Sequence, residues 1–402
     1  MNIGKKIKKN GFQYCVKIFW EYHVDRIIQN IIIAFTKKKP LKNIIIIESH
    51  NDFDCNGGAF YKHLLNNNYN NKYQIVWLLK HPKNKPHDLP KNVKAYPLYK
   101  PNLKKDICIC TAKFLLADNV ITEKKRKDQL SIYCSHGAFG LKNVQGVCTL
   151  PPSVDYTISP SSSVDAIMNK QWSLEKDSTK IIHIGYPSED VFYHKIKDEL
   201  SCIKRKTYNK TILWMPTFRK GGGFNRNDSV VESTYGIPMF ETEEELNKLN
   251  DLLALNNSLL VIKIHPMQDI KTIEKLHGRT NIIILTGNDI KKYGIDNYSM
   301  MASVDAMVSD YSSAAYTYLH ADKPIGIMLS DLNEYKLGLI VNNPDEYIPG
   351  QKIFTLDDFF EFVMDVVNES DPYKEKRHRV FDMIYKFHDG HSCERLARFM
   401  KI

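Results

Sequence analysis

The sequence lacks any run of about 18 consecutive apolar residues, the length that a transmembrane helix needs. It also lacks the order of basic start, apolar middle and small-residue cleavage site that is typical of a secretory signal, so we expect no such signal. Its eight cysteines form no CxxC pair. Cysteines scattered in this way favour buried, reduced thiols over a zinc or disulfide site.

Two nucleotide-binding motifs are also missing. No GxxxxGK[ST] phosphate loop occurs, which excludes a P-loop enzyme, and no GxGxxG fingerprint follows the first predicted strand. Asp52-Phe53-Asp54 is a DxD of the kind that can hold a divalent metal. We expect it to lie in a loop of the first domain, away from the donor site described below, and we expect neither a metal nor a cofactor.

What is present is a chain of 402 residues with 43% apolar and 25% charged residues, which indicates a globular protein of two or three domains. The net charge is +10, and residues 1–43 carry ten basic residues against two acidic ones. The remainder is nearly neutral. A nucleic-acid-binding protein needs a basic face on its folded domains, so we expect no nucleic-acid partner.

Between the basic clusters, residues Phe12 to Phe35 place apolar side chains at helical spacing. Two interpretations stay open. In the first, an amphipathic helix lies on an anionic membrane, with the lysines of residues 5–42 on lipid phosphates. In the second, the helix packs on the body of the protein and carries a solvated basic tail.

From residue 43 onward, short apolar runs alternate with helix-length segments, which predicts parallel sheets covered on both faces. Gly185-Tyr186-Pro187, followed by a polar helix to about Thr207, separates two series of strands. We therefore predict a basic segment 1–42, a first α/β domain 43–188 and a second α/β domain 189–402. The predicted strands are Asn43–Ser49, Gln74–Leu79, Asp106–Cys110, Asn119–Thr122, Ser131–Ser135 and Tyr156–Ser159, then Thr211–Met215, Leu259–His265, Asn281–Leu285, Ala306–Ser309 and Pro324–Met328.

Ligands of such folds bind at the carboxyl ends of the strands, and polar residues follow several predicted strands here. In the first domain, His136-Gly137 places an imidazole, a potential general base, at the rim of the sheet. The glycine allows another molecule to approach the backbone closely. Taken alone, His136 is more often a structural histidine.

Three loops of the second domain carry hydrogen-bond donors. Thr217 and Arg219 suit phosphate or base recognition, and Lys263 and His265 share one side of a strand and suit a diphosphate. The paired serines at 312 and 313 open a helical pattern, Ala314–His320, and offer hydroxyls to an anion. Singly, each has an ordinary structural interpretation. Together they indicate a nucleotide diphosphate in the second domain, facing the histidine of the first.

The ordered set of motifs from about residue 43 to 400 resembles the CDP-glycerol glycerophosphotransferases, the bacterial teichoic acid primases and polymerases. The matching pieces are His136-Gly137, Gly185-Tyr186-Pro187 with Asp190, Pro216-Thr217-Phe218-Arg219, Lys263-Ile264-His265-Pro266, Ser309-Asp310-Tyr311-Ser312-Ser313, Lys323-Pro324, Asp331-Leu332-Asn333-Glu334-Tyr335, Pro349-Gly350 and Asp389-Gly390. The opening strand with Glu48-Ser49 also fits.

The resemblance implies a GT-B fold, in which two Rossmann-like domains face a cleft, with peripheral attachment to the inner face of the cell membrane. It also implies transfer of a polyol phosphate, glycerol phosphate above all, from a CDP-linked donor to a hydroxyl of a lipid-linked or growing polymer, with release of CMP. His136 and His265 are then the expected catalytic residues, and Gly137 and Lys142 lie on the acceptor side. The expected donor-binding residues are Thr217, Arg219, Lys263, His265, Ser309, Asp310, Ser312, Ser313 and Asp331.

Two other functions stay open. A GT-B glycosyltransferase that uses a CMP-sugar or another nucleotide sugar for capsule or surface polysaccharide would show a similar His-Pro motif and paired serines. A non-catalytic membrane- or polymer-binding protein would keep the α/β body as a scaffold. Such a scaffold has no need of His136, His265 and the two serines together.

Overall fold

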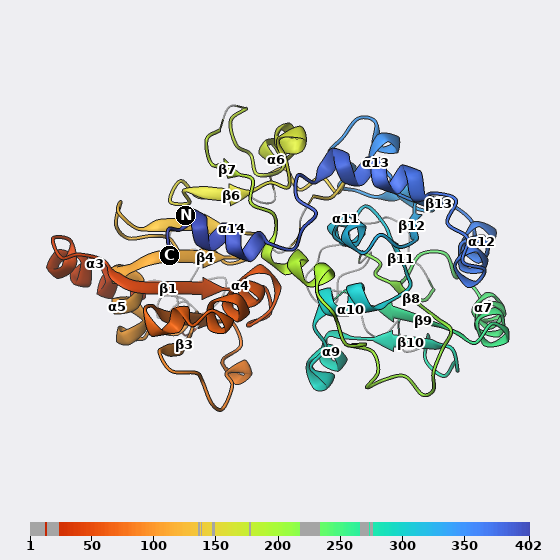
Figure 1. Cartoon of the computed structure of the whole chain (residues 1–402), viewed down its shortest axis with the longest axis horizontal. Helices are drawn as coiled ribbons and strands as arrows, with labels where there is room; N and C mark the ends of the chain where they lie inside the picture. The colour runs from red at the N-terminus through yellow and green to blue at the C-terminus, as the bar shows by residue number, and fades with distance from the viewer. Residues whose placement is uncertain are drawn as a thin grey trace.

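The computed structural model describes residue 13 and residues 24–402, except residues 136, 138, 147–148, 177, 218–233, 266–272 and 274–275. Two fully parallel sheets form two lobes (Figure 1). The strands of the first sheet are β1 (Lys42–Glu48), β2 (Gln74–Leu79), β3 (Val93–Pro97), β4 (Ala112–Ala117), β5 (Leu130–Tyr133), β6 (Tyr156–Ile158) and β7 (Ile181–Ile182). Those of the second are β8 (Lys210–Trp214), β9 (Ser258–Lys263), β10 (Ile282–Leu285), β11 (Ala306–Ser309), β12 (Ile325–Met328) and β13 (Gln351–Ile353).

Each sheet begins in its middle and is wound outward in both directions. The spatial orders are β3-β2-β1-β4-β5-β6-β7 and β10-β9-β8-β11-β12-β13. The direction of winding therefore reverses between β1 and β4 in one sheet and between β8 and β11 in the other. This is the doubly wound, Rossmann-like arrangement, and it confirms the predicted α/β class with two such sheets.

Helices cover both faces of each sheet. The α-helices are α3 (Val24–Thr36), α4 (Cys55–Asn66), α5 (Leu103–Thr111), α6 (Asp165–Gln171), α7 (Glu243–Leu255), α9 (Gly287–Tyr293), α10 (Asn297–Ser303), α11 (Ser313–Thr317), α12 (Leu356–Val367), α13 (Lys374–Ile384) and α14 (Ser392–Phe399). Short 3-10 helices are η1 (Tyr69–Asn71), η2 (Pro82–Asn84), η3 (Ser162–Val164), η4 (Pro187–Tyr193), η6 (Tyr318–Ala321), η7 (Leu332–Glu334) and η8 (Pro344–Tyr347).

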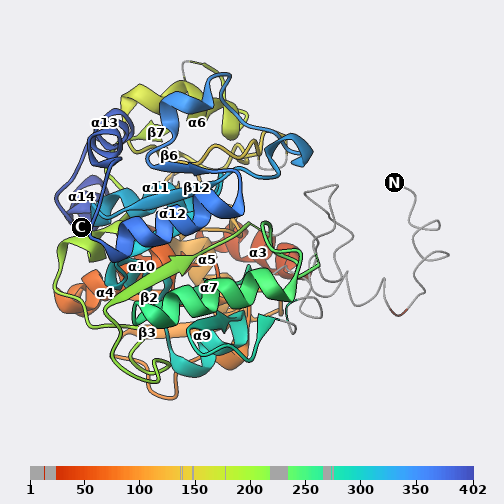
Figure 2. The same ribbon diagram turned by 90° about the vertical axis from the view of Figure 1, so that its right-hand side faces the viewer.

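Burial on both faces explains the continuous apolar runs of the strands. In β1, Ile45 and Ile47 pack in the core that includes Phe60 of α4, whereas Ile44 and Ile46 face Ile109 of α5. In the second lobe, α7 and α12 lie side by side over one face of the sheet (Figure 2). A strand without a polar face is what a parallel sheet between two helical layers requires.

Two of the predicted strands are wrong. Asp106–Cys110 lies in α5, whose N-cap Asn102 accepts a hydrogen bond from the Lys105 amide, and Asn119–Thr122 follows β4 as a loop. A short apolar run does not distinguish a buried helix from a buried strand, and the cap was the overlooked signal. Cys108 and Cys110 are therefore helical, and both are buried free thiols, as are three others; Cys202 is exposed.

Helix α3 is the described part of the predicted amphipathic segment. It packs on α5 through two buried polar contacts: Gln29 donates to Asp106 at 2.7 Å, and Asp25 pairs with Lys105. Its opposite side leaves Ile27, Ile31 and Phe35 exposed by 53%, 56% and 75%. The helix thus packs on the body, as one interpretation held, and also keeps an apolar face outward.

The two lobes are joined by the 3-10 helix η4. The prediction of a polar helix that runs to about Thr207 is wrong, because η4 ends at Tyr193 and no helix follows it before β8. Within η4, Glu189 is buried and accepts hydrogen bonds from Thr317 (3.2 Å) and Tyr385 (3.0 Å), and it pairs with His320 at 3.1 Å. After α13 the chain returns to the first lobe, where α14 contacts η4 and α4 (Figure 1). We keep the domain boundary at residues 188/189 as a proposal, with α14 lying on the first lobe.

Candidate functional site

The polar loops of the second lobe gather where its winding reverses. Thr217 follows β8, and residues 310–313 follow β11, which is the neighbour of β8 in the sheet. His265 follows β9 on the other side of β8, and Asp331 follows β12. Because parallel strands end at one edge, these predicted donor-binding residues share the carboxyl edge of four adjacent strands, where ligands of doubly wound sheets bind.

Asp310 holds two of these loops together. Its carboxylate accepts hydrogen bonds from the Thr217 amide at 2.8 Å, the Thr217 hydroxyl at 2.6 Å and the Ser312 amide at 3.1 Å. Ser309 is fully buried and donates to the Met215 carbonyl at 3.1 Å. Asp310 and Ser309 therefore fix the geometry of two loops of the predicted donor site.

The paired serines begin α11. Ser312 is its N-cap and accepts a hydrogen bond from the Ala314 amide at 3.4 Å. Ser313 faces the first lobe: a Cβ atom added to Gly137 would lie 2.5 Å from the Ser313 hydroxyl, and one added to Gly140 would lie 2.9 Å from the Ser313 amide nitrogen. The loop of the first lobe therefore lies directly against the start of α11, and a larger residue at either position would have to displace Ser313.

His136, the expected general base, and Arg219 lie outside the described residues. Gly137, the chain neighbour of His136, is described and touches Ser313. Ser135, on the other side of His136, has a φ of +65° and is buried. A non-glycine residue in the left-handed region is uncommon, and its carbonyl is held by the Asn56 side-chain amide at 2.8 Å.

Lys263 ends β9, and its charge is poorly solvated. Burial lowers the pKa of Lys263 to about 8, and the negative charge of Asp54 in the first lobe opposes this decrease. Asp54 is therefore near the donor side, so the expectation that the DxD lies away from it is wrong. Asp52 has a structural role, because its carboxylate accepts hydrogen bonds from the backbone amides of Lys80 (2.8 Å) and His81 (3.0 Å).

Lys142 belongs to an antiparallel contact between the lobes. Its amide donates to the Tyr311 carbonyl at 3.1 Å, and it forms a β-bridge with Leu339. The Ile340 amide donates to the Leu141 carbonyl at 2.8 Å. The Lys142 ammonium lies 5.8 Å from the ring centre of Tyr335.

The rings of Tyr335 and Tyr311 contact each other with centres 4.1 Å apart and planes tilted by 33°, and the Tyr311 hydroxyl donates to Asp331 at 3.4 Å. Lys142 of the first lobe and Asp331 of the second therefore belong to the same contact between the lobes, and the Tyr335–Tyr311 pair lies between them.

Two buried acidic residues lie at the point where the winding of the first sheet reverses: Glu48, to which sequence reasoning gave no role beyond the family resemblance, and Asp118, which it missed. Glu48 at the end of β1 accepts from the amides of Asp118 (3.2 Å) and Asn119 (2.9 Å) and pairs with Lys80 at 2.9 Å. Asp118 follows β4 and accepts from the Gly57 amide at 2.8 Å; burial raises its pKa well above the ordinary value. The wrong strand prediction Asn119–Thr122 placed the carboxyl end of this strand after residue 122, so Asp118 was not recognised as the residue that follows β4.

Among the described residues, no helix is both long and apolar enough to cross a membrane. Among the same residues, no group of three or more His, Cys, Asp and Glu side chains is placed to hold a metal ion.

Comparison with solved structures agrees with the fold. Structures of the wall teichoic acid polymerase TagF superpose with a TM-score of 0.71 at 17% identity, over 94% of this chain and 93% of that chain. Another TagF structure in this group was obtained after a soak with CDPG. A UDP-N-acetylglucosamine 2-epimerase from Listeria monocytogenes gives a TM-score of 0.52 at 13% identity, over 90% of this chain and 98% of that chain. At these identities the likeness concerns the fold.

Sequence comparison gives the family. The chain is 27% identical to the teichoic acid glycerol-phosphate primase of Bacillus subtilis, over 77% of this chain and 80% of that protein. It is 28% identical to the teichoic acid ribitol-phosphate polymerase TarL of Staphylococcus aureus, over 54% of this chain but only 36% of that longer protein. The family model of the CDP-glycerol:poly(glycerophosphate) glycerophosphotransferases matches residues 30–401, and the chain therefore belongs to this family of transferases.

Proposed function

We propose that this protein transfers a polyol phosphate, glycerol phosphate in the first place, from a CDP-linked donor to a hydroxyl of a lipid-linked or growing surface polymer. One observation carries the proposal: the glycine next to His136 lies against Ser313, at the carboxyl edge where the donor loops of the second lobe meet. We propose that the base at position 136 acts beside these hydroxyl groups, which suit a diphosphate, because phosphoryl transfer from a nucleotide requires a base and diphosphate-binding groups held together.

In the proposed reaction His136 accepts the proton of the acceptor hydroxyl. The acceptor oxygen bonds to the phosphorus distal to cytidine, the bond from that phosphorus to the bridging oxygen breaks, and CMP leaves with the bond electrons. Lys263, His265, Ser312 and Ser313 hold the diphosphate and stabilise the charge that develops on it. Thr217 and Arg219 help to hold the donor, and Asp310 positions Thr217 and Ser312.

We further propose that the protein works at the inner face of the bacterial cell membrane as a peripheral protein. The outward Ile27, Ile31 and Phe35 of α3 support this proposal, since an amphipathic helix with an apolar outer face binds at a lipid interface. The basic residues that accompany α3 in the sequence add attraction to anionic lipid headgroups.

The test compares CDP-glycerol, CDP-ribitol and CMP-sialic acid as donors, with release of CMP as the readout and mass spectrometry of the acceptor as the identification. We expect CMP release with CDP-glycerol and an acceptor heavier by one or more glycerol phosphate units. Activity with CMP-sialic acid alone, and a new glycosidic bond, would replace the proposal by a glycosyltransferase function.

Two variants assign the histidines. His136→Ala should lose at least about a hundredfold in kcat while it still binds donor, because a positioned base contributes about 10²–10⁴ in rate. His265→Ala should instead weaken donor binding. Near-normal turnover of the first variant, or unchanged donor affinity and turnover of the second, would remove that residue from its role.

A further inference from the structure

The segment from residue 72 to 105 is strongly basic, although the chain beyond residue 43 is nearly neutral on average. It holds nine lysines and a single acidic residue, Asp88. Four of its lysines are exposed along the loop before β3 and on β3 itself, and we name them the lysine track: Lys83, Lys85, Lys91 and Lys94. β3 is an edge strand, so no further strand of the sheet covers this side of the lobe.

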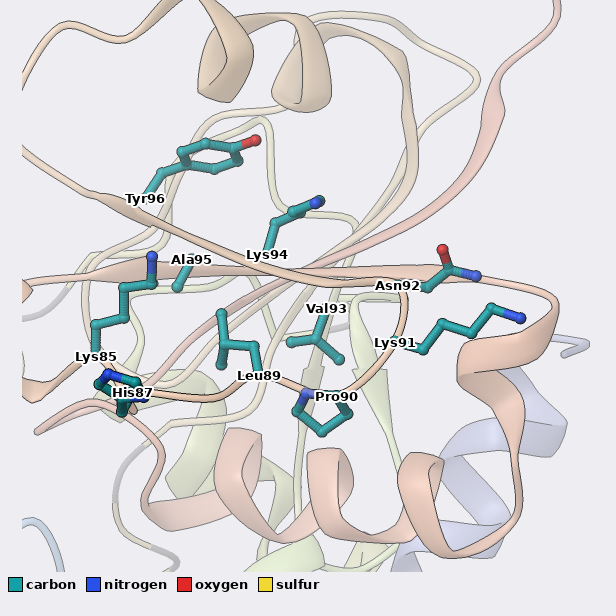
Figure 3. Close-up of a pocket in the computed structure, with 10 residues that line it drawn as sticks. All are labelled: Lys85, His87, Leu89, Pro90, Lys91, Asn92, Val93, Lys94, Ala95 and Tyr96. Carbon is teal, nitrogen blue, oxygen red and sulfur yellow. The ribbon is translucent and has the colours of Figure 1, made fainter.

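The lysine track borders a cavity. A pocket of ≈ 430 Å³ lies between the loop of residues 85–92 and β3, and Lys85, Lys91 and Lys94 line it (Figure 3). Leu89 and Val93 belong to the apolar part of its wall. A concave site lined by three lysines and by apolar side chains suits an anionic chain of alternating phosphates and short carbon units.

The charges of the track are not neutralised by carboxylates. Among the ion pairs found in the described part of the chain, none involves a lysine of the track. Asp88, the acidic residue of this segment, lies 3.2 Å from His87 instead. Uncompensated ammonium groups on one surface create a positive potential that attracts a polyanion.

The track begins beside the candidate active site. The amides of Lys80 and His81 donate to Asp52, and the Asn84 side chain donates to the same carboxylate at 3.0 Å. Residues 80–84 therefore pack on the loop that holds Asp52 and Asp54, and the charge of Asp54 acts on Lys263. From residue 84 the chain continues through the track to β3, at the edge of the sheet. A long acceptor with its terminal hydroxyl in the cleft has this path available for the rest of its length.

A polymer fits this surface better than a bilayer does. In residues 80–97, all of which are described, no large apolar side chain is exposed, whereas a lipid-binding face needs such groups. The exposed isoleucines and Phe35 belong to α3 instead.

We propose that the lysine track binds the phosphodiester-linked body of the acceptor polymer, behind the hydroxyl end that reacts. This inference rests on the proposed function, because it names the part of the acceptor that the first lobe recognises.

The test uses the full chain and a fluorescently labelled, water-soluble oligo(glycerol phosphate), with binding measured by fluorescence anisotropy in the absence of donor. The variant Lys85→Gln/Lys91→Gln/Lys94→Gln should bind the oligomer at least about tenfold more weakly at low salt. The difference should shrink as salt rises, since exposed charges are screened. Lys85→Arg/Lys91→Arg/Lys94→Arg keeps the charge and should keep the affinity.

The matched control is Lys291→Gln/Lys292→Gln/Lys374→Gln, which removes the same charge from exposed sites of the second lobe and should leave oligomer affinity within about twofold. Equal affinity of the track variant and the wild type would overturn the inference. So would unchanged oligomer binding combined with lost binding to phosphatidylglycerol vesicles, which would assign the track to the membrane. Should no CDP-linked donor release CMP, the proposed function fails, but the binding measurement still decides this inference.

Discussion

At the scale of the single residue, Lys263 gives the site a pH dependence. Its pKa of about 8 in the free protein means that the cation predominates below pH 8 and the neutral amine above it. A bound diphosphate favours the cation and raises this pKa. Donor affinity should therefore be constant below pH 8 and decrease as the pH rises above it, by up to about tenfold per pH unit.

Calorimetric titration with CDP-glycerol at pH 7, 8 and 9 measures this dependence. Lys263→Arg is the matched comparison, because a guanidinium stays charged over the whole range and its affinity should not change with pH through this group. Equal donor affinity of the wild type at pH 7 and pH 9 would exclude Lys263 from the diphosphate site.

The types of residue at the site could be predicted from the sequence, but their division of labour could not. Thr217, Asp310 and Ser312 all follow strands, so their place at the carboxyl edge was predictable. The Asp310 carboxylate accepts hydrogen bonds from Thr217 and Ser312. The bond from Thr217 is possible only because β8 and β11 are neighbours in the sheet. This pairing joins segments about ninety residues apart in the sequence, and no local pattern carries it.

At the scale of the element, the Glu189 contacts fix the far end of the helix that the paired serines begin. Glu189 of η4 accepts from Thr317, the last residue of α11, and pairs with His320 in η6. Glu189→Ala removes the acceptor and leaves three buried polar groups without it. We expect a loss of about 3 kcal/mol in the free energy of unfolding.

Chemical denaturation measures this loss. Glu189→Gln, which keeps an acceptor oxygen, should lose less, and Glu375→Ala on the exposed face of α13 should change stability by less than about 0.5 kcal/mol. Equal stability of Glu189→Ala and the wild type would show that η4 does not hold the lobes through this residue.

Elements with a distinct sequence signature were predicted well, and those without one were not. β2 and β11 have the predicted bounds, since each is a short apolar run between polar residues. The central strand β4 was missed, because the segments on either side of it were predicted as strands instead. The edge strands β3, β7 and β13 were missed as well: β3 contains Lys94 and ends in Pro97, and β7 has two residues. Such edge strands bury little surface, so their sequences need little apolar character.

At the scale of the whole molecule, the alternation of strands and helices predicted two α/β domains with parallel sheets, but not how the lobes meet. The backbone contact of Leu141 and Lys142 with Leu339 and Ile340 is made by loop residues of ordinary composition. Their pairing depends on the relative placement of two domains, which local patterns do not encode. The glycines at 137 and 140 were the available signal, because a close approach to Ser313 requires them.

The orientation of α3 on the whole molecule predicts which residues contact a membrane. Gln29 and Asp25 hold one side of the helix on α5, so the outward Ile27, Ile31 and Phe35 are the groups free to enter a lipid interface. The variant Ile27→Gln/Ile31→Gln/Phe35→Gln should bind vesicles of phosphatidylglycerol and phosphatidylethanolamine at least about tenfold more weakly in sedimentation, since each apolar side chain contributes about 1 kcal/mol or more when buried. Leu255→Gln, at an 85% exposed position on α7 of the other lobe, should leave vesicle binding unchanged. Full vesicle binding by the α3 variant would mean that this face does not attach the protein to lipid.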